Sequence, residues 1–444
     1  MTLQIISKKH INIKQYFQGK SEPPNNFSEV EPKNNFDDSN LHKINDLKYK
    51  LNSVKTKLDD IYKLPNASNI MRLFDPFAKT KYIIAKKLNT NNVTNAWLKC
   101  YELIYNHELI PLNKVIENFV YFDNAAFPGS FILATNHIVK TLSKIKNFEW
   151  NASSLLNEEK PQNYNTDPLK DIYNLYVNYP ERWLMNELNN GDITDRKNIL
   201  DFQRQFKEKY GVEHSVDLYT CDLGTDVSSN YNAQEEIHFM MNLCQIVCGL
   251  SVLKSGGHML IKHYTIFEPF TISYISLLSN LFEQVIITKP ITSKITNSEI
   301  YLVCKKYKYP FKQDSSQQSI YDLFMEMAQN PKEINDQING QINGQINGQI
   351  NGKKNNRQLQ HLISSEYIKH QIHDISNAML NIFDNQIRAL TLFTEIVEIY
   401  ADVKKRENYM YKLRHINKKY ISEFYNLPIK PINKIHQLKM TNVY

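Results

Sequence analysis

The spacing of apolar side chains divides the chain into helices and strands. Helices are predicted where apolar residues recur at every third or fourth position, over 41–64, 95–109, 130–144, 234–253 and 269–281. Shorter runs of branched and aromatic residues predict buried strands at 119–122, 148–150, 215–221, 258–262, 283–287 and 300–304. Strands that alternate with helices predict an α/β fold, in which helices cover both faces of a mostly parallel sheet.

The two ends of the chain have a different composition from this central part. The N-terminal end is polar and contains Pro23-Pro24, which indicates a poorly ordered arm. Residues 337–352 repeat the letters QING four times, and such a tract of Gly, Asn and Gln is typical of a flexible linker. The predicted organisation is a disordered arm at 1–40, a helical N-terminal extension at 41–90, the α/β domain at 91–310, a linker at 311–358 and a helical C-terminal region at 359–444.

Composition narrows the classes of protein that fit. The net charge is +7, from 53 basic and 46 acidic residues, which permits a polyanionic partner without requiring one. The 5 cysteines are odd in number and include no CxxC pair, which argues against a disulfide framework or a zinc site and favours a reducing compartment. The cysteine pattern therefore predicts no metal site. Neither a signal peptide nor a long apolar run is apparent, so we expect no membrane partner and a cytoplasmic location.

Two segments outside the predicted domain core are rich in basic residues. One contains Arg72, Lys79, Lys81, Lys86 and Lys87, and a solvated helix face explains this segment well. In the other, basic residues alternate with aromatic ones: Lys404, Lys405, Arg406, Lys412, Arg414, Lys418 and Lys419 with Tyr409, Tyr411 and Tyr420. Basic side chains can follow an RNA backbone while aromatic rings stack on bases. A helical accessory domain with a solvated basic face explains the same residues, and the sequence leaves both interpretations open.

Polar residues suited to chemistry lie at the ends of the predicted strands. The small-residue turn Asp123–Phe131 follows the first strand of the domain, where a nucleoside-type cofactor can approach the backbone. Asp222 ends a buried strand, and the pair Gly256-Gly257 forms a turn into an apolar strand that ends on Lys262. Glu299 opens the last strand, and Lys99 lies in the helix before the first. There is neither a GxGxxG fingerprint nor a Walker lysine, so NAD and ATP fit poorly.

In this order, Lys99, Asp222, Lys262 and Glu299 resemble the K-D-K-E tetrad of the FtsJ-like ribose 2′-O-methyltransferases. The turn DNAAFPGSF is similar to the cofactor loop of that family, and Gly191-Asp192 is similar to its segment whose acid contacts adenine. The segment VTNAWLKCYEL at 93–103 resembles the version found in large cytoplasmic DNA viruses. The resemblance covers about residues 70–308. It implies a Rossmann-like methyltransferase fold with S-adenosyl-L-methionine as cofactor and helical N- and C-terminal extensions.

The resemblance also implies roles for individual residues. The catalytic residues would be Lys99, Asp222, Lys262 and Glu299. The cofactor-binding residues would be Asp123, Ala125, Ala126, Pro128, Gly129, Ser130, Phe131, Asp192 and Asp222. The loop departs from the family pattern because Asn124 and Ala125 replace a hydrophobic-Gly pair and Ser130 replaces a glycine. No acid is obvious after the second strand, where the family pattern has one near the cofactor ribose, and Asn151, Ser153 or Ser154 are the alternatives for that position.

The reaction explains why these residue types are needed. A ribose hydroxyl is a weak acid that must lose its proton as it attacks the sulfonium methyl, and Lys262 can take that proton only in its neutral form. The ammonium of Lys99 lowers the pKa of Lys262, whereas the two carboxylates oppose this effect, so the net pKa is left open. Alignment of the reacting atoms is expected to contribute more to the rate than proton transfer does.

The expected function is therefore methylation of RNA at a ribose 2′-hydroxyl. The virus-like segment 93–103 favours the 5′ cap region of mRNA, in the host cytoplasm or the virion if the protein is viral. The expected partners are RNA, with capped mRNA favoured, and a capping complex of which this chain would be a subunit. Two alternatives stay open: ribosomal or transfer RNA as substrate, and a non-catalytic RNA-binding subunit that kept the methyltransferase fold.

Overall fold

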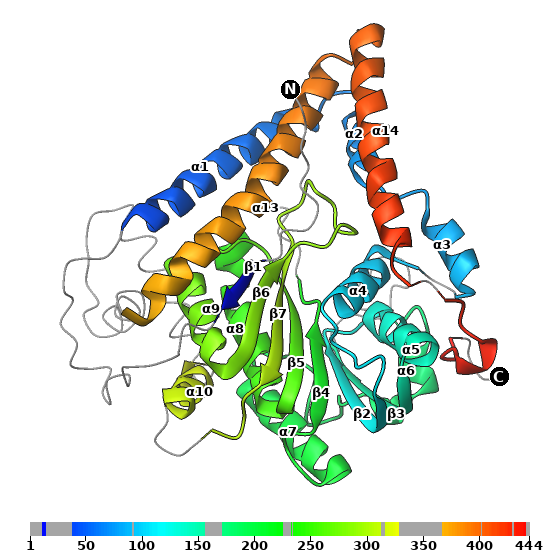
Figure 1. Cartoon of the computed structure of the whole chain (residues 1–444), viewed down its shortest axis with the longest axis vertical. Coiled ribbons are helices and arrows are strands. Elements are labelled where there is room, and N and C mark those ends of the chain that lie inside the picture. The colour runs from blue at the N-terminus through cyan, green and yellow to red at the C-terminus, as the bar shows by residue number, and fades with distance from the viewer. Residues whose placement is uncertain are drawn as a thin grey trace.

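A seven-stranded sheet forms the centre of the molecule, with helices on both of its faces (Figure 1). The computed structural model describes residues 11–14, 38–90, 93–155, 171–224, 232, 234–311, 316–327, 366–400, 402–428 and 430–440. The strand order across the sheet is β1-β6-β7-β5-β4-β2-β3. The strands are β1 (Ile11–Lys14), β2 (Val115–Asn124), β3 (Lys144–Ser153), β4 (Val216–Cys221), β5 (Leu253–His263), β6 (Phe282–Thr288) and β7 (Ile300–Tyr307).

Most of the strands run in one direction. The pairs β2–β3, β2–β4 and β4–β5 are parallel, whereas β7 is antiparallel to both of its neighbours, β5 and β6. Strands β2 to β6 therefore share one direction, and only β7 and β1 oppose it. The predicted α/β fold with a mostly parallel sheet is confirmed. As a result, the carboxyl ends of β2, β4 and β5 meet at the same edge of the sheet as the start of β7.

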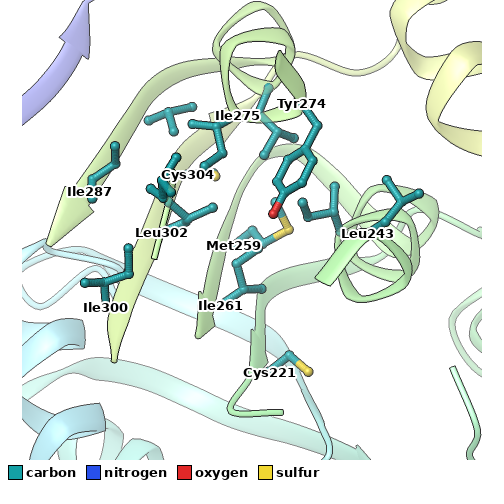
Figure 2. Close-up of a cluster of buried hydrophobic side chains, with 14 of the residues drawn as sticks. Cys221, Leu243, Met259, Ile261, Tyr274, Ile275, Ile287, Ile300, Leu302 and Cys304 are labelled. Carbon is teal, nitrogen blue, oxygen red and sulfur yellow. The ribbon is translucent and has the colours of Figure 1, made fainter. Parts of the chain in front are cut away.

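Side chains of the central strands enter two separate apolar layers. In β4, Tyr219 and Cys221 belong to one layer and Leu218 belongs to the other. Figure 2 shows part of the first layer, where Leu243 and Tyr274 of the covering helices lie over Met259 and Ile261 of β5. This layer is covered by α7 (Arg196–Tyr210), α8 (Gln234–Val252), α9 (Pro269–Leu281) and α10 (Ser316–Met327). The other is covered by α4 (Asn95–Asn106) and α5 (Ser130–Leu142).

The N- and C-terminal helices pack against each other beside the sheet. Figure 1 shows α1 (Asp38–Ile61) lying along α13 (Glu366–Glu398), while α14 (Val403–Tyr425) lies near α2 (Ala67–Met71) and α3 (Lys81–Leu88). Aromatic contacts join the two ends of the chain, since Phe74 packs on Phe393 and Phe77 packs on Phe424. The shorter helical segments are η1 (Arg72–Phe74), α6 (Leu175–Asn178), η2 (Pro180–Arg182) and η4 (Lys434–His436).

Three predictions of local structure need correction. Residues 11–14 of the predicted arm form β1, which pairs with the otherwise open edge of β6. Residues 316–327 of the predicted linker form α10, because Ile320 and Phe324 lie four positions apart and are both buried. The predicted Gly-Gly turn lies inside β5, whose pairing with β4 is interrupted between Leu253 and His258. The QING tract lies outside the described residues, as does the rest of the arm.

Candidate active site

The four tetrad residues of the sequence gather at one edge of the sheet. Asp222 follows the last residue of β4, and Lys262 is the next-to-last residue of β5. Glu299 immediately precedes β7, which begins at the same edge because it runs antiparallel to β5. Helix α4 brings Lys99 to this edge from the adjoining layer. The topology therefore explains why residues far apart in the chain come together here.

Lys99 and Glu299 form a buried ion pair. The ammonium of Lys99 donates to both carboxylate oxygens of Glu299, at 3.0 and 2.9 Å, and the two residues are only 7% and 8% exposed. The Ser293 hydroxyl donates to the same carboxylate at 2.8 Å. Since a buried charge is tolerated only when it is paired and hydrogen-bonded, each residue depends on the other.

Lys262 and Asp222 form the second pair. The Lys262 ammonium lies 3.3 Å from the Asp222 carboxylate and donates to the Asp222 main-chain carbonyl at 2.6 Å. The segment after Asp222 lies close over this lysine, because a Cβ added to Gly224 would lie 3.0 Å from the Lys262 ammonium. The position of the amine is therefore determined by main chain as well as by the carboxylate.

Two tyrosines that the sequence did not single out connect the pairs. Tyr301, which lies beside Lys262 in the β5–β7 register, donates its hydroxyl to Asp222 at 2.8 Å. The Lys99 ammonium lies 5.7 Å from the centre of the Tyr301 ring. Tyr264 lies among all four tetrad residues: burial raises the pKa of its phenol, the two lysines lower this pKa, and the two carboxylates raise it. A tyrosine two positions beyond a strand-end lysine was the available sequence signal.

Glu102 and Lys289 hold the chain segment that leads to Glu299, here called the 289–299 loop. The buried Glu102 carboxylate accepts hydrogen bonds from Ile291 N at 3.0 Å, Thr292 N at 3.0 Å and Thr292 Oγ1 at 2.9 Å. At the other end, the Lys289 ammonium donates to main-chain carbonyls of Asn297 and Glu299, at 2.9 and 2.8 Å. Glu102 is one helical turn after Lys99, so α4 contacts both ends of the loop.

The charges of the site act on one another. Burial alone would raise the pKa of Glu299, but three neighbouring lysines outweigh it and lower this pKa to about 2. They are Lys99, Lys262 and Lys289. Burial lowers the pKa of Lys262, yet Asp222, Tyr264 and Glu299 outweigh burial and raise this pKa above its ordinary value. The net effect that the sequence left open therefore favours the ammonium form of Lys262.

The predicted cofactor loop connects β2 to α5 at the same edge of the sheet. Its backbone is held by β3, since Ala126 N donates to Ser153 O at 2.9 Å and Phe127 N donates to Ser154 Oγ at 3.3 Å. Gly129 has φ +105°, and Ala125, which stands where the family has a glycine, has φ +55°. Ala125 and Pro128 are partly exposed, whereas Ala126, Ser130 and Phe131 are buried beside them.

Asp123, the first residue of this loop, is buried. Its carboxylate accepts a hydrogen bond from the Thr220 hydroxyl at 2.6 Å, and burial raises its pKa well above the ordinary range. Among the described residues, its second carboxylate oxygen has no hydrogen-bond partner. The Ser153 hydroxyl, at the end of the adjacent strand, has none either. A ligand rich in hydroxyl or amine groups would satisfy both atoms, so this edge of the sheet fits a nucleoside-type cofactor.

Of the three residues proposed for the ribose position, Ser153 is the one whose side chain has no hydrogen-bond partner among the described residues. Asn151 uses both ends of its amide: it donates to the Tyr210 hydroxyl at 2.9 Å and accepts from Lys209 at 2.8 Å. The Ser154 hydroxyl accepts the hydrogen bond from Phe127 N described above.

The turn that contains Asp192 is fixed by its own side chains. Asp192 Oδ1 accepts from Thr194 N at 2.9 Å and from Thr194 Oγ1 at 2.7 Å. The turn lies directly against the end of β3, because a Cβ added to Gly191 would lie 2.0 Å from Ser154 O. Asp192 is therefore next to the strand that holds the predicted cofactor loop.

The described residues contain no group of three or more His, Cys, Asp or Glu side chains placed to hold a metal ion. All five cysteines are buried free thiols. Among the helices in the described ranges, none is long and apolar enough to span a membrane.

The fold and site together define a class of protein. A mostly parallel sheet that carries a loop suited to a nucleoside cofactor, beside two buried lysine–carboxylate pairs, is the arrangement of a Rossmann-like methyltransferase. Residues 92–307 match the family model described as FtsJ-like methyltransferase. This match covers the α/β domain and bears out the family resemblance that the sequence motifs suggested.

Similar proteins come from viruses and animals. A probable methyltransferase of African swine fever virus is 36% identical over 267 residues, which are 57% of this chain and 60% of that protein. Cap-specific mRNA (nucleoside-2′-O-)-methyltransferase 2 of Drosophila melanogaster is 29% identical over 262 residues, 59% of this chain and 36% of that protein. The protein of the same name from Danio rerio is 31% identical over 269 residues, 59% of this chain and 34% of that protein.

These alignments cover less than two thirds of each relative. Among solved structures, a ribosomal RNA methyltransferase from Plasmodium falciparum matches 48% of this chain and 97% of its own, with 20% identity and a TM-score of 0.34. This structural similarity is too low to support any statement about function.

Proposed function

We propose that this protein transfers a methyl group from S-adenosyl-L-methionine to a ribose 2′-hydroxyl of RNA. The observation that carries the proposal is the placement of Lys262 and Lys99, each paired with a carboxylate, beside the loop Asp123–Phe131. The match of residues 92–307 to the FtsJ-like methyltransferase model supports the same reaction. A domain of this family that keeps all four tetrad residues is equipped for catalysis.

The loop and the turn around Asp192 would hold the cofactor. Asp192 would contact the adenine, and the unpartnered Ser153 hydroxyl would contact the ribose in place of the missing acid. Ala125, Pro128 and Gly129 would allow close approach of the backbone. The bound cofactor supplies a sulfonium methyl group as the electrophile.

Lys262 would hold the ribose hydroxyl and take its proton. Because neighbouring charges raise the pKa of this lysine, only a small fraction is neutral near pH 7. Much of the rate enhancement must then come from alignment of the hydroxyl, which the two hydrogen-bonded contacts of Lys262 to Asp222 make possible. Lys99 and Glu299 would position the groups around the hydroxyl and balance the charge of the site.

For the substrate, we propose the 5′ region of capped mRNA. Two of the similar proteins are named as cap-specific mRNA 2′-O-methyltransferases. Membership of a capping complex fits this substrate. Ribosomal or transfer RNA is the alternative, and parallel assays on capped mRNA fragments and on structured RNA distinguish the two.

Calorimetric titration with S-adenosyl-L-methionine tests the first step of the proposal. We expect the wild-type protein to bind, Asp192→Ala to bind more weakly and Lys262→Ala to bind with unchanged affinity. Lys262 is expected to act on the RNA hydroxyl and not on the cofactor, which is why its loss spares binding. Absence of binding by the folded wild-type protein would favour a non-catalytic RNA-binding subunit instead.

A further inference from the structure

The outer face of α14 carries a continuous band of basic and polar side chains. Lys405, Lys412 and Lys419 repeat every seven residues, and Lys404, Tyr411 and Lys418 do the same one position earlier. Seven residues of a helix return to nearly the same face and advance about 10 Å along the axis. All of these side chains are exposed, as are Asn408 and His415 between them and Ser422 beyond Lys419. The band follows most of the helix, with the exposed Glu407 at its border and Lys405 paired with Asp402 at 3.5 Å.

The positive charge of the protein is concentrated in this part of the chain. Residues 403–440 contain ten lysines and arginines but only two glutamates, a net charge of +8. The whole chain has a net charge of +7, so all the remaining residues together contribute −1. A solvated surface without a binding role usually mixes both signs of charge. The surface of α14 is therefore more positively charged than the rest of the protein.

The band has a fixed position relative to the tetrad. The inner face of α14 buries Leu413 and Phe424, and Asn417 donates to Leu73 O at 2.6 Å. Just after the helix, Pro428 O accepts a hydrogen bond at 2.7 Å from Tyr101 of α4, the helix that carries Lys99. A ligand held along α14 would thus be held in a defined relation to the candidate active site.

The second basic segment of the sequence joins the same region. The Lys87 ammonium of α3 lies 4.6 Å from the centre of the Tyr425 ring, at the end of α14. Lys86 and Lys87 are exposed beside Tyr82, which is 77% exposed. The two basic segments, far apart in the sequence, therefore extend one surface, here called the α14 surface, from the band on α14 to α3.

We propose that the α14 surface binds the phosphate backbone of the RNA substrate outside the catalytic site. This proposal rests on the proposed function, because that function makes RNA the polyanion that the protein must hold. Lysines spaced along a helix can neutralise successive phosphates. Tyr411, which is 70% exposed within the band, can stack on an unpaired base. An anionic membrane is disfavoured as a partner because the band has no run of apolar side chains to enter a lipid layer.

The test replaces one row of the band. Lys405, Lys412 and Lys419 are changed together to Gln, and the matched control changes Lys43, Lys50 and Lys57, which have the same spacing and are exposed on α1. Binding to a fluorescent single-stranded capped RNA is measured by anisotropy over a series of salt concentrations, without cofactor. We expect the α14 variant to bind more weakly and the slope of log K against log salt to fall by about 2, for three lost contacts to single-stranded RNA. The control should bind as the wild type does.

Kinetic measurements separate this proposal from the proposed function. The α14 variant should keep the wild-type affinity for S-adenosyl-L-methionine and the wild-type kcat, with KM for RNA raised. If the variant loses RNA binding while the wild type shows no methyl transfer, RNA binding by the α14 surface is supported and the proposed reaction is contradicted. If the α14 variant keeps the wild-type RNA affinity and salt slope, the proposal that this surface binds RNA is wrong. It is also wrong if the substitutions abolish binding to anionic vesicles and leave RNA binding unaffected.

Discussion

Lys99 and Glu299 lie 200 positions apart in the chain, yet the Lys99 ammonium lies 2.9 and 3.0 Å from the two oxygens of the Glu299 carboxylate. The pair joins α4 to the start of β7 and is almost entirely buried. Both oxygens of Glu299 accept hydrogen bonds from Lys99, and the carboxylate that pairs with Lys262 is that of Asp222. The pairing of the four residues therefore sets which carboxylate controls the protonation of the proposed base.

The pH dependence of catalysis should report this control. Asp222 is the strongest of the groups that raise the pKa of Lys262, so Asp222→Asn should lower that pKa and make the neutral amine available at lower pH. We expect log kcat of the wild type to rise throughout the accessible alkaline range. In Asp222→Asn it should level off at lower pH, with a smaller maximum because orientation is lost.

Tyr301→Phe is the control for this measurement, since it removes a hydrogen bond to Asp222 but keeps the carboxylate. Its profile should move less than that of Asp222→Asn. A profile of Asp222→Asn that coincides in shape with the wild type would remove Asp222 from the control of Lys262.

Glu102 should matter for catalysis although it touches no reacting atom. Its carboxylate accepts three hydrogen bonds from the 289–299 loop, and a Gln side chain offers only one oxygen for them. Glu102→Gln should cost about 1–3 kcal/mol at the loop and lower kcat while leaving cofactor affinity intact. The control Glu117→Gln removes only an exposed ion pair with Lys146 and should change little. Equal kcat values for the two variants would contradict the role given to Glu102.

Gly191 should be essential for the turn around Asp192. Both Gly191 and Gly211 have positive φ, +80° and +83°, so alanine is strained at either position. Only at Gly191 would the added Cβ meet backbone, at 2.0 Å from Ser154 O, whereas at Gly211 nothing lies within 4 Å. We expect Gly191→Ala to weaken cofactor binding by about tenfold or more. Gly211→Ala should leave it nearly unchanged, and similar affinities in the two variants would argue against this site for Asp192.

Two buried histidines should make the fold sensitive to acid. Burial lowers the pKa of His137 to about 4 and that of His263 to about 3. In the unfolded chain both imidazoles are protonated below about pH 6.5. In the folded protein they stay neutral until the pH falls to their lowered pKa values. The stability is therefore fully present above pH 6.5 and is lost as the pH falls through 5, by up to about 1.4 kcal/mol per pH unit for each histidine.

Urea unfolding at pH 7, 6 and 5 measures this loss. His137→Gln should reduce its slope, whereas His415→Gln, at an exposed position on α14, should leave the slope unchanged. A free energy of unfolding that stays constant over this range would contradict the assignment of both histidines.

The sequence could predict elements whose causes are local. The strands β2 to β7 and the helices α4, α5, α8 and α9 follow from apolar spacing. Asp222, Lys262 and Glu299 could be noticed as charged residues at strand ends, and the tetrad with Lys99 was implied by the family resemblance. Strand β1 could not be predicted because its partner is the open edge of β6, which is a tertiary property. The same holds for Glu102, whose three hydrogen bonds reach a loop about 190 positions away. Neither pattern nor spacing reveals such contacts.

The role of the two basic segments, around Lys79–Lys87 and along α14, also could not be predicted from the sequence. Each could be recognised as a charged stretch, but the sequence could not decide between a solvated face and a binding face. The structure adds that a band of exposed basic side chains follows the outer side of α14 and that the Lys87 ammonium lies over the Tyr425 ring.

The central claim is the transfer of a methyl group to a ribose hydroxyl with Lys262 as the proton acceptor. It is tested most directly with tritiated S-adenosyl-L-methionine and matched capped and uncapped RNAs, followed by nuclease digestion that locates the labelled nucleotide. The account predicts label on the ribose of a nucleotide next to the cap with the wild-type protein. It predicts none with Lys262→Ala or Lys262→Arg, since a guanidinium stays protonated. Label on a base, or full activity of Lys262→Arg, would contradict it.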